Sequence, residues 1–246
     1  MKQNLFLDTS EELIKKNSFL VQGKKKRNIK IEHFIVDDEN YQIIKRDKGD
    51  YYTITYDKDI ILKHSKVIVK EVVIILKDIF KKYKESGKTL IIGLGNSDIP
   101  ADAIGPEVTN KIIATNHYDD FLSIPKIALF NPEVTSKTGI SSYQLIKMLV
   151  NNLKPNTIII IDSMATNNIN RLNNCIEISD TGIIPGSAIN TNKEINSKTF
   201  GVPVIAIGVP LLISFDDAFY TTPDINEILN STSDVISSAI NTIFLN

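Results

Sequence analysis

Residues 154–162 read KPNTIIIID, and this stretch decides the fold that the sequence predicts. Pro155 ends the helical pattern before it, because proline cannot donate a backbone hydrogen bond inside a helix. The isoleucines Ile158–Ile161 form the short, continuous apolar run that is typical of a parallel strand buried on both faces. Asp162 follows at once. A carboxylate is therefore expected at the carboxyl end of a central strand.

Apolar runs and helical patterns alternate on both sides of this strand. A helix is expected from Pro106, because proline suits the first turn of a helix. The alternation predicts an α/β fold, with a mostly parallel central sheet flanked by helices. Cys175–Ile178 could instead be an antiparallel edge strand. The other predicted strands are Thr89–Ile92, Ile127–Phe130 and Val204–Gly208, and further helices are expected at Ser141–Leu153 and from Thr222 to the end.

The first part of the chain predicts an N-terminal β-hairpin. Ile31–Val36, Tyr41–Ile44 and Tyr51–Tyr56 are strand-like, with a turn at residues 48–50. A helix is then expected between residues 65 and 87, where apolar residues recur at helical spacing. We therefore expect one α/β domain over residues 1–246, in which residues 1–60 form an N-terminal segment with the hairpin and residues 61–246 form the core.

Composition and charge narrow the class of protein. A single cysteine, Cys175, excludes an internal disulfide and a cysteine-based metal site, and its apolar surroundings predict an inert core residue. No apolar run is long enough to cross a membrane and no signal pattern opens the chain, so a soluble, cytoplasmic protein is expected. The basic run at residues 24–27 lacks interleaved aromatic residues, which favours a solvated loop over a nucleic-acid site.

Three segments follow predicted strands, where open α/β sheets form their sites. They are residues 93–102, 162–165 and 179–187. The pair Gly93 and Gly95 lacks the third glycine of a dinucleotide-binding motif. We expect these glycines to let the backbone pass close to a substrate or a neighbouring strand.

Two aspartates in these segments, Asp102 and Asp162, are the candidate catalytic residues. Each could instead cap the N-terminus of a following helix, as aspartate often does. Two neighbouring carboxyl groups can share one proton, so that one activates a water while the other donates to a carbonyl oxygen. Such a pair hydrolyses amides without serine, cysteine or a cofactor. The expected substrate-binding or supporting residues are Asn96, Asp98, Ser163, Asp180, Thr181, Gly186 and Ser187.

Two alternative chemistries receive less support from the residues. The chain has no Gly-x-Ser-x-Gly motif, and none of its three histidines lies in a nucleophile motif, which disfavours a serine triad. Asp102, Asp162 and His117 could together hold a metal ion, since carboxylate and imidazole are suitable ligands. No His-Glu-x-x-His motif supports that minority alternative.

Several uncommon motifs between about Leu90 and Pro210 resemble those of the spore germination protease family. They are GLGNSDIPADAIGP from Gly93, KPNTIIIIDSMA from Lys154, RLNNCIEISDTGIIPGSAI from Arg171 and FGVPVIAIGVP from Phe200. The resemblance implies an endopeptidase that degrades small acid-soluble, DNA-coating spore proteins during germination. It also implies an atypical aspartic protease, whose two essential aspartates match Asp102 and Asp162.

The resemblance carries further expectations. The fold should be similar to that of the hydrogenase maturation proteases. Members form homo-oligomers in the spore core and are made as zymogens, and LFLDTSEEL at residues 5–13 resembles the segment that flanks the processing point. A protein substrate is expected, without direct nucleic-acid or membrane binding. The other functions left open are a metal-dependent protease that matures one partner protein and a degenerate member that acts as a binding or regulatory protein.

The chain also departs from the family pattern. It is shorter, with only LLISFDDAFYT between Pro210 and Thr222, and the stretch between His117 and Thr138 is trimmed. Residues 133–136 read EVTS where the family has a Gly-Val-Met-Gly-like motif, and residues 186–190 read GSAIN where it has GSGVGN. These departures are expected to alter substrate range and assembly more than the aspartate pair.

Overall fold

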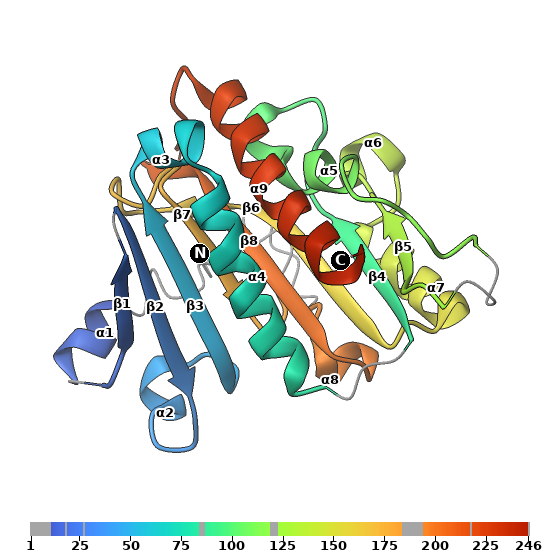
Figure 1. The fold of residues 1–246 in the computed structure, drawn as a ribbon, viewed down its shortest axis with the longest axis horizontal. Coiled ribbons are helices and arrows are strands. Elements are labelled where there is room, and N and C mark those ends of the chain that lie inside the picture. The colour runs from blue at the N-terminus through green and yellow to red at the C-terminus, as the bar shows by residue number, and fades with distance from the viewer. Residues whose placement is uncertain are drawn as a thin grey trace.

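One mixed sheet, covered by helices on both faces, organises the chain (Figure 1). The computed structural model describes residues 11–17, 19–26, 28–83, 87–118, 123–183, 194–216 and 218–245. Gly186 and Ser187, two of the expected supporting residues, lie outside this part of the chain. Within it the strand order is β1-β2-β3-β7-β8-β6-β4-β5, with β9 paired to β8. The predicted α/β fold class is confirmed.

The strands divide into a parallel half and an antiparallel half. β5, β4, β6 and β8 are neighbours and run parallel, whereas β1, β2, β3, β7 and β9 pair antiparallel with their neighbours. The strands are β1 (Gln22–Lys26), β2 (Ile29–Val36), β3 (Gly49–Tyr56), β4 (Lys88–Gly93), β5 (Lys126–Phe130), β6 (Thr157–Thr166), β7 (Cys175–Ser179), β8 (Val204–Phe215) and β9 (Ala218–Tyr220).

The helices cover both faces of the sheet. Figure 1 shows α4 and α9 crossing its near face, and α7 packs in the core on the other face. Serine 141 caps α7 through a reciprocal hydrogen-bond pair with Gln144, as a capping box does. The helices are α1 (Glu11–Lys16), α2 (Tyr41–Ile44), α3 (Lys58–Lys63), α4 (Lys66–Lys81), the 3-10 turn η2 (Pro100–Asp102), α5 (Ile104–Thr109), α6 (Thr135–Thr138), α7 (Ser142–Leu153), α8 (Ser197–Phe200) and α9 (Ile225–Leu245).

The isoleucine run of β6 fills both cores. Ile159 and Ile161 pack in the core under α4 and α9, and Ile158 and Ile160 pack in the core under α7. Successive side chains of a strand point to opposite faces, so a strand covered on both faces needs apolar residues at every position. The sequence prediction for this strand is therefore confirmed, together with its position in the middle of the sheet.

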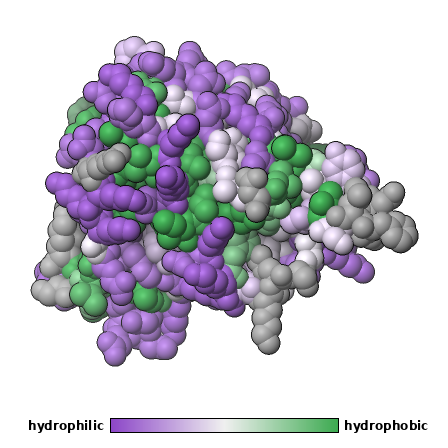
Figure 2. All heavy atoms as spheres, viewed as in Figure 1, coloured by the Kyte–Doolittle hydropathy of each residue, from purple (hydrophilic) through white to green (hydrophobic). Residues whose placement is uncertain are grey.

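The surface over α4 and α9 is partly apolar. Figure 2 shows apolar side chains in the middle of this face, surrounded by hydrophilic ones. Ile74 of α4 is 49% exposed, and Phe80 contacts Phe244 edge to face with 5.6 Å between ring centroids. Among the helices of the described segments, none is long and apolar enough to span a membrane.

Three sequence expectations differ from the structure. Tyr41–Ile44, predicted to be strand-like, forms the short helix α2, which ends at Lys45 in a left-handed conformation. Lys24–Lys26 of the basic run, predicted to be a loop, belong to the exposed strand β1, and Arg27 lies outside the described residues. β7 runs antiparallel to both of its neighbours, as the alternative for Cys175–Ile178 expected, but it is no edge strand, because it lies between β3 and β8. Residues 180–183, which follow β7, therefore lie toward the opposite end of the sheet from Asp162.

Candidate active site

Asp102 ends the turn η2, in the segment that follows β4. The backbone N–H of Asn96 donates to Asp102 Oδ2 at 2.9 Å, and the N–H of Asp102 donates to the Ile99 carbonyl at 2.8 Å. The N-cap of α5 is Ala103, so the capping alternative for Asp102 is wrong. The carboxylate of Asp102 instead closes the loop back onto the end of β4.

Asp162 lies within β6, directly after the isoleucine run. β6 continues to Thr166, so Asp162 caps no helix either. Its backbone is paired with Gly208 of β8, and the N–H of Leu94 donates to the carbonyl of Ile161 at 2.8 Å. The segment that leads to Asp102 therefore leaves β4 directly beside Asp162.

The two carboxyl groups are electrostatically coupled. Burial, followed by the negative charge of Asp102, raises the pKa of Asp162 well above its ordinary range, and the N–H of Ser163 opposes this shift by donating to the carboxylate. Burial also raises the pKa of Asp102, against the stabilising N–H of Asn96, and the charge of Glu133 raises it further. Because neighbouring carboxylates repel, this arrangement favours one proton on the pair.

Three glycines allow the segments around Asp102 to pack closely. Gly95 has φ +120°, and a Cβ atom there would lie 1.8 Å from the carbonyl oxygen of Asp102. A Cβ on Gly93 would lie 2.3 Å from the carbonyl oxygen of Gly105, at the start of α5. The predicted close backbone approach at Gly93 and Gly95 is confirmed, but the backbone that approaches belongs to η2 and α5 and not to a neighbouring strand. The neighbour that approaches is the segment carrying Asp102.

A polar network beside Asp102 was missed by the sequence analysis. Ser97 Oγ donates to Glu133 Oε1 at 2.6 Å, and Lys137 Nζ lies 3.2 Å from Glu133 Oε2. Lys137 also donates to Ser97 Oγ at 3.0 Å and pairs with Asp98 at 2.9 Å, so the predicted supporting residue Asp98 belongs to this network. The spacing of Glu133 and Lys137, four residues apart, could have indicated their ion pair, but not the contacts to Ser97 and Asp98.

Ser163 supports Asp162 differently from the expectation. Its N–H donates to the Asp162 carboxylate. Strand alternation turns its side chain to the face opposite that of Asp162. There its hydroxyl is buried and has no hydrogen-bond partner among the described residues. The contribution of Ser163 to the site therefore comes from its backbone.

Asp180 and Thr181 do not lie with the aspartate pair. Asp180 accepts from the N–H of Asp50 at 2.8 Å and from Lys82 Nζ at 2.7 Å. In the sheet, Glu177 of β7 is level with Asp162, because both residues pair with Gly208. Asp180 and Thr181 therefore lie farther toward the end of the sheet at which the parallel strands begin. The structure therefore does not bring Asp180 and Thr181 to the aspartate pair, because β7 runs antiparallel to β8.

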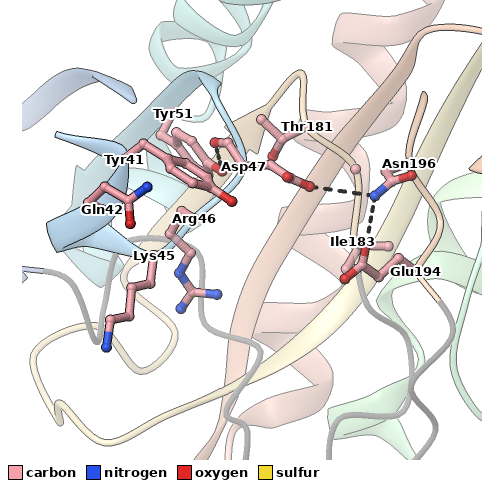
Figure 3. A pocket seen from close by; sticks show the side chains of 11 residues that line it. Tyr41, Gln42, Lys45, Arg46, Asp47, Tyr51, Thr181, Ile183, Glu194 and Asn196 are labelled. Atoms are coloured by element: carbon pink, nitrogen blue, oxygen red, sulfur yellow. Dashed lines mark hydrogen bonds between the residues drawn. The ribbon is translucent and has the colours of Figure 1, made fainter. Parts of the chain in front are cut away.

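Thr181 lines a separate pocket with a volume of about 360 Å³. Figure 3 shows Tyr41, Asp47 and Asn196 around this pocket, with Thr181 at one side. Asn196 donates to Glu194 at 2.8 Å. These side chains come from the segment between β2 and β3 and from the segment that follows β7. The pocket belongs to the end of the sheet at which β7 ends.

The metal alternative does not fit the residues. Across the described segments, no group of three or more histidine, cysteine, aspartate or glutamate side chains is arranged to hold a metal ion. His117 instead contacts the ring of Tyr118, with 4.2 Å between the ring centroids. The predicted set of Asp102, Asp162 and His117 is therefore not assembled.

The fold and the site define an α/β protein with two coupled aspartates at the carboxyl ends of parallel strands. The chain belongs to the germination protease family, whose family model matches residues 2–236. Germination proteases of Oceanobacillus iheyensis and Clostridium acetobutylicum are each 34% identical to it, over 232 and 212 residues. The alignments cover 88% and 80% of this chain but 61% and 64% of those relatives. This chain thus spans about three fifths of their length.

A solved structure is also similar. A NiFe hydrogenase maturation protease from Thermococcus kodakarensis aligns with a TM-score of 0.44 and 16% sequence identity. The alignment covers 68% of this chain and 99% of that protein.

Proposed function

We propose that this protein is an endopeptidase that hydrolyses small acid-soluble, DNA-binding spore proteins during germination. Membership of the germination protease family supports a peptidase that acts in germination. The observation that carries the proposal is the coupling of Asp102 with Asp162, because a pair that shares one proton supplies a base and an acid together.

The two aspartates have different roles in the proposed reaction. Asp162 holds the shared proton, since burial and the charge of Asp102 raise the pKa of this group well above its ordinary range. Asp102 is ionised and accepts the N–H of Asn96 with one oxygen, so its other oxygen is available to a water. Asp102 is therefore the general base, and Asp162 is the general acid.

Each proton in this scheme has a defined destination. The oxygen of the water attacks the carbonyl carbon while Asp102 takes one proton from this water. Asp162 gives its proton to the carbonyl oxygen. The tetrahedral intermediate then breaks its C–N bond, and Asp102 gives its proton to the leaving nitrogen. Asp162 regains a proton from the hydroxyl of the intermediate as the new carboxyl group forms. The pair thus returns to its starting state, with one proton on Asp162.

The resemblance to the family extends the proposal beyond the chemistry. The protein is proposed to be made as a zymogen, as the resemblance implies, and to act as a homo-oligomer in the cytoplasm of the forespore and spore core. The apolar surface over α4 and α9 supports an assembly of several copies, because exposed apolar patches commonly mark protein contacts. The substrate is proposed to be protein alone, with no direct contact to nucleic acid.

The test uses the full chain with Asp102→Asn and Asp162→Asn, each assayed on purified small acid-soluble spore proteins. Each variant is expected to lose about a hundredfold to ten-thousandfold in rate, the usual contribution of a general acid or base. Asp59→Asn is the control, because Asp59 belongs to an exposed ion pair with Lys63 on α3. Full activity in either site variant would overturn the mechanism. An inactive wild-type chain that still binds the spore protein would favour the degenerate, binding function.

A further inference from the structure

Glu133 has a backbone conformation that favours glycine. Its φ angle is +59°, in the left-handed region that residues other than glycine rarely adopt. The residue precedes α6 and follows β5, so it lies beyond the carboxyl end of a parallel strand. Ser142 Oγ donates to the Glu133 carbonyl at 2.8 Å and fixes the backbone there. A strained conformation persists only where surrounding contacts hold it, and such residues are concentrated at functional sites.

The Glu133 side chain joins two loops of the candidate site. Ser97 Oγ, in the loop after β4, donates to Glu133 Oε1 at 2.6 Å. Lys137 Nζ bridges the two loops, because it lies 3.2 Å from Glu133 Oε2 and 2.9 Å from Asp98 Oδ2. Neither Glu133 nor Lys137 is fully exposed, since their side chains keep 27% and 31% of their accessible surface. The link therefore holds the loop after β4 against the loop after β5.

The loop that Glu133 holds also carries a contact to Asp102. Asn96 precedes Ser97, and its N–H is the donor to Asp102 Oδ2 at 2.9 Å. Asn96 Oδ1 in turn accepts the N–H of Asp98 at 3.0 Å, which closes the loop on itself. Any movement of Ser97 away from Glu133 would therefore displace the N–H that orients Asp102.

We propose that Glu133 is a positioning residue for Asp102, which acts by holding Ser97 so that the Asn96 N–H stays on the aspartate. Lys137 is its partner and limits the negative charge that Glu133 adds to the site. This inference rests on the proposed peptidase function only for its effect on catalysis. The positioning itself is a property of the free protein and can be measured without substrate.

The surrounding charges support this assignment. Asp102 faces Asp162 from β6 and Glu133 from the loop after β5, and the charge of Glu133 contributes to the raised pKa of Asp102. Ser97 and Lys137 hold the pKa of the Glu133 carboxyl below its ordinary value, so Glu133 is ionised. Glu133 thus contributes both a hydrogen-bond acceptor for Ser97 and a charge near the proposed base.

The test compares Glu133→Ala with Glu133→Gln in the full chain. Glu133→Ala removes the acceptor for Ser97, and Glu133→Gln keeps an acceptor oxygen but removes the charge. We expect Glu133→Ala to speed amide exchange at Asn96 about tenfold and to lower kcat about tenfold, with KM within about twofold. Glu133→Gln is expected to restore Asn96 protection and kcat to within about threefold of the wild type. Lys63→Met, in the exposed pair with Asp59, is the control and leaves both unchanged.

Two results would overturn the inference. One is unchanged amide exchange at Asn96 in Glu133→Ala. The other is failure of Glu133→Gln to recover both exchange protection and kcat, which would indicate a general structural defect. If the wild-type chain cleaves no spore protein, the proposed function fails, while the exchange measurement still decides whether Glu133 holds the loop.

Discussion

Asp102 lies beyond the end of β4, Asp162 lies within the neighbouring parallel strand β6, and the charge of Asp102 raises the pKa of Asp162. Two segments of the chain that are sixty residues apart meet here, because parallel strands end at the same edge of a sheet. The close packing at Gly95 and the N–H of Asn96 fix Asp102 in this place. This coupling has measurable consequences for stability and for the pH dependence of activity.

Asp162→Asn is expected to stabilise the protein at neutral pH. The pKa of Asp162 is raised above its ordinary value of 3.8 by burial, so the folded protein binds this proton more tightly than the unfolded chain does. The contribution of Asp162 to the free energy of unfolding is therefore fully present at low pH. It is lost as the pH rises from 3.8 through the pKa that Asp162 has in the folded protein. Denaturant unfolding at pH 7 should show a gain of about 1 kcal/mol or more for the variant, which shrinks in acid. A less stable variant at pH 7 would contradict the assignment.

The value of kcat/KM should depend on pH through the ionisation of both aspartates. Only the state with one proton has an acid and a base together, so kcat/KM should fall where both groups are protonated and where both are ionised. Burial and repulsion raise both pKa values above the ordinary aspartate value, which moves this window toward neutral pH. The check is a kcat/KM profile on a peptide substrate. A profile that follows one ordinary carboxyl group would be inconsistent with a coupled pair.

Gly95→Ala should disrupt the site more than a glycine substitution elsewhere. The added Cβ atom would lie 1.8 Å from the carbonyl oxygen of Asp102, and φ at this position is +120°. We expect a loss of about 2–3 kcal/mol in the free energy of unfolding, together with loss of activity. Gly139→Ala is the matched control, since φ there is +72° but no atom lies within 4 Å of the added Cβ.

The Gly139 control separates backbone strain from steric clash. Gly139→Ala should cost about 1 kcal/mol from strain alone and should leave the activity unchanged. Equal losses of stability in the two variants would mean that Gly95 is required only for its φ angle, and that its close approach to Asp102 has no separate effect.

A buried ion pair between Arg171 and Glu177 should be costly to break. Their side chains keep 7% and 1% of their accessible surface, and Glu177 is level with Asp162 across Gly208 in the sheet. Replacing one partner leaves the other charge buried without its counter-charge. Glu177→Gln should therefore lower the free energy of unfolding, measured with a chemical denaturant, by about 3–5 kcal/mol. The double variant Arg171→Met with Glu177→Leu should recover much of that loss.

The control for the buried pair is an exposed one. Lys63→Met breaks the pair between Lys63 and Asp59, whose side chains are 66% and 77% exposed, and should change stability by less than about 1 kcal/mol. A loss in Glu177→Gln as small as that in Lys63→Met would show that the buried pair does not stabilise the fold.

The central strands and both aspartates could be predicted from the sequence for a physical reason. A strand buried on both faces needs an unbroken apolar run, and Ile158–Ile161 is such a run that ends directly at Asp162. The loop from Gly93 to Asp102 follows a similar run at the neighbouring strand. These features are local in the sequence, and the parallel arrangement brings their ends together.

The direction of β7 could not be read in the same way. Its residues are buried on both faces whether the strand runs parallel or antiparallel, so the pattern of Cys175–Ser179 contains no information on direction. The antiparallel pairing with β8 places Asp180 beside Asp50 and Lys82, away from Asp162. The rule that sites form at the carboxyl ends of strands therefore does not bring this loop to the aspartate pair.

Glu133 escaped prediction because its role depends on backbone conformation. Its left-handed φ of +59° and its contact with Ser97 are tertiary features that no local pattern specifies. In the sequence, residues 133–136 are recognisable only as a departure from the family motif. The structure gives that departure a consequence, because it brings a third carboxylate near Asp102.

The most direct test of the coupled pair is a carbon-13 NMR titration of the Asp162 carboxyl group in the wild type and in Asp102→Asn. We expect a pKa for Asp162 well above 3.8 in the wild type, and a lower pKa once residue 102 carries no charge. Burial remains in the variant, so part of the elevation should persist. An Asp162 pKa that is unchanged by Asp102→Asn, or that is ordinary in the wild type, would contradict the coupling on which the proposed mechanism depends.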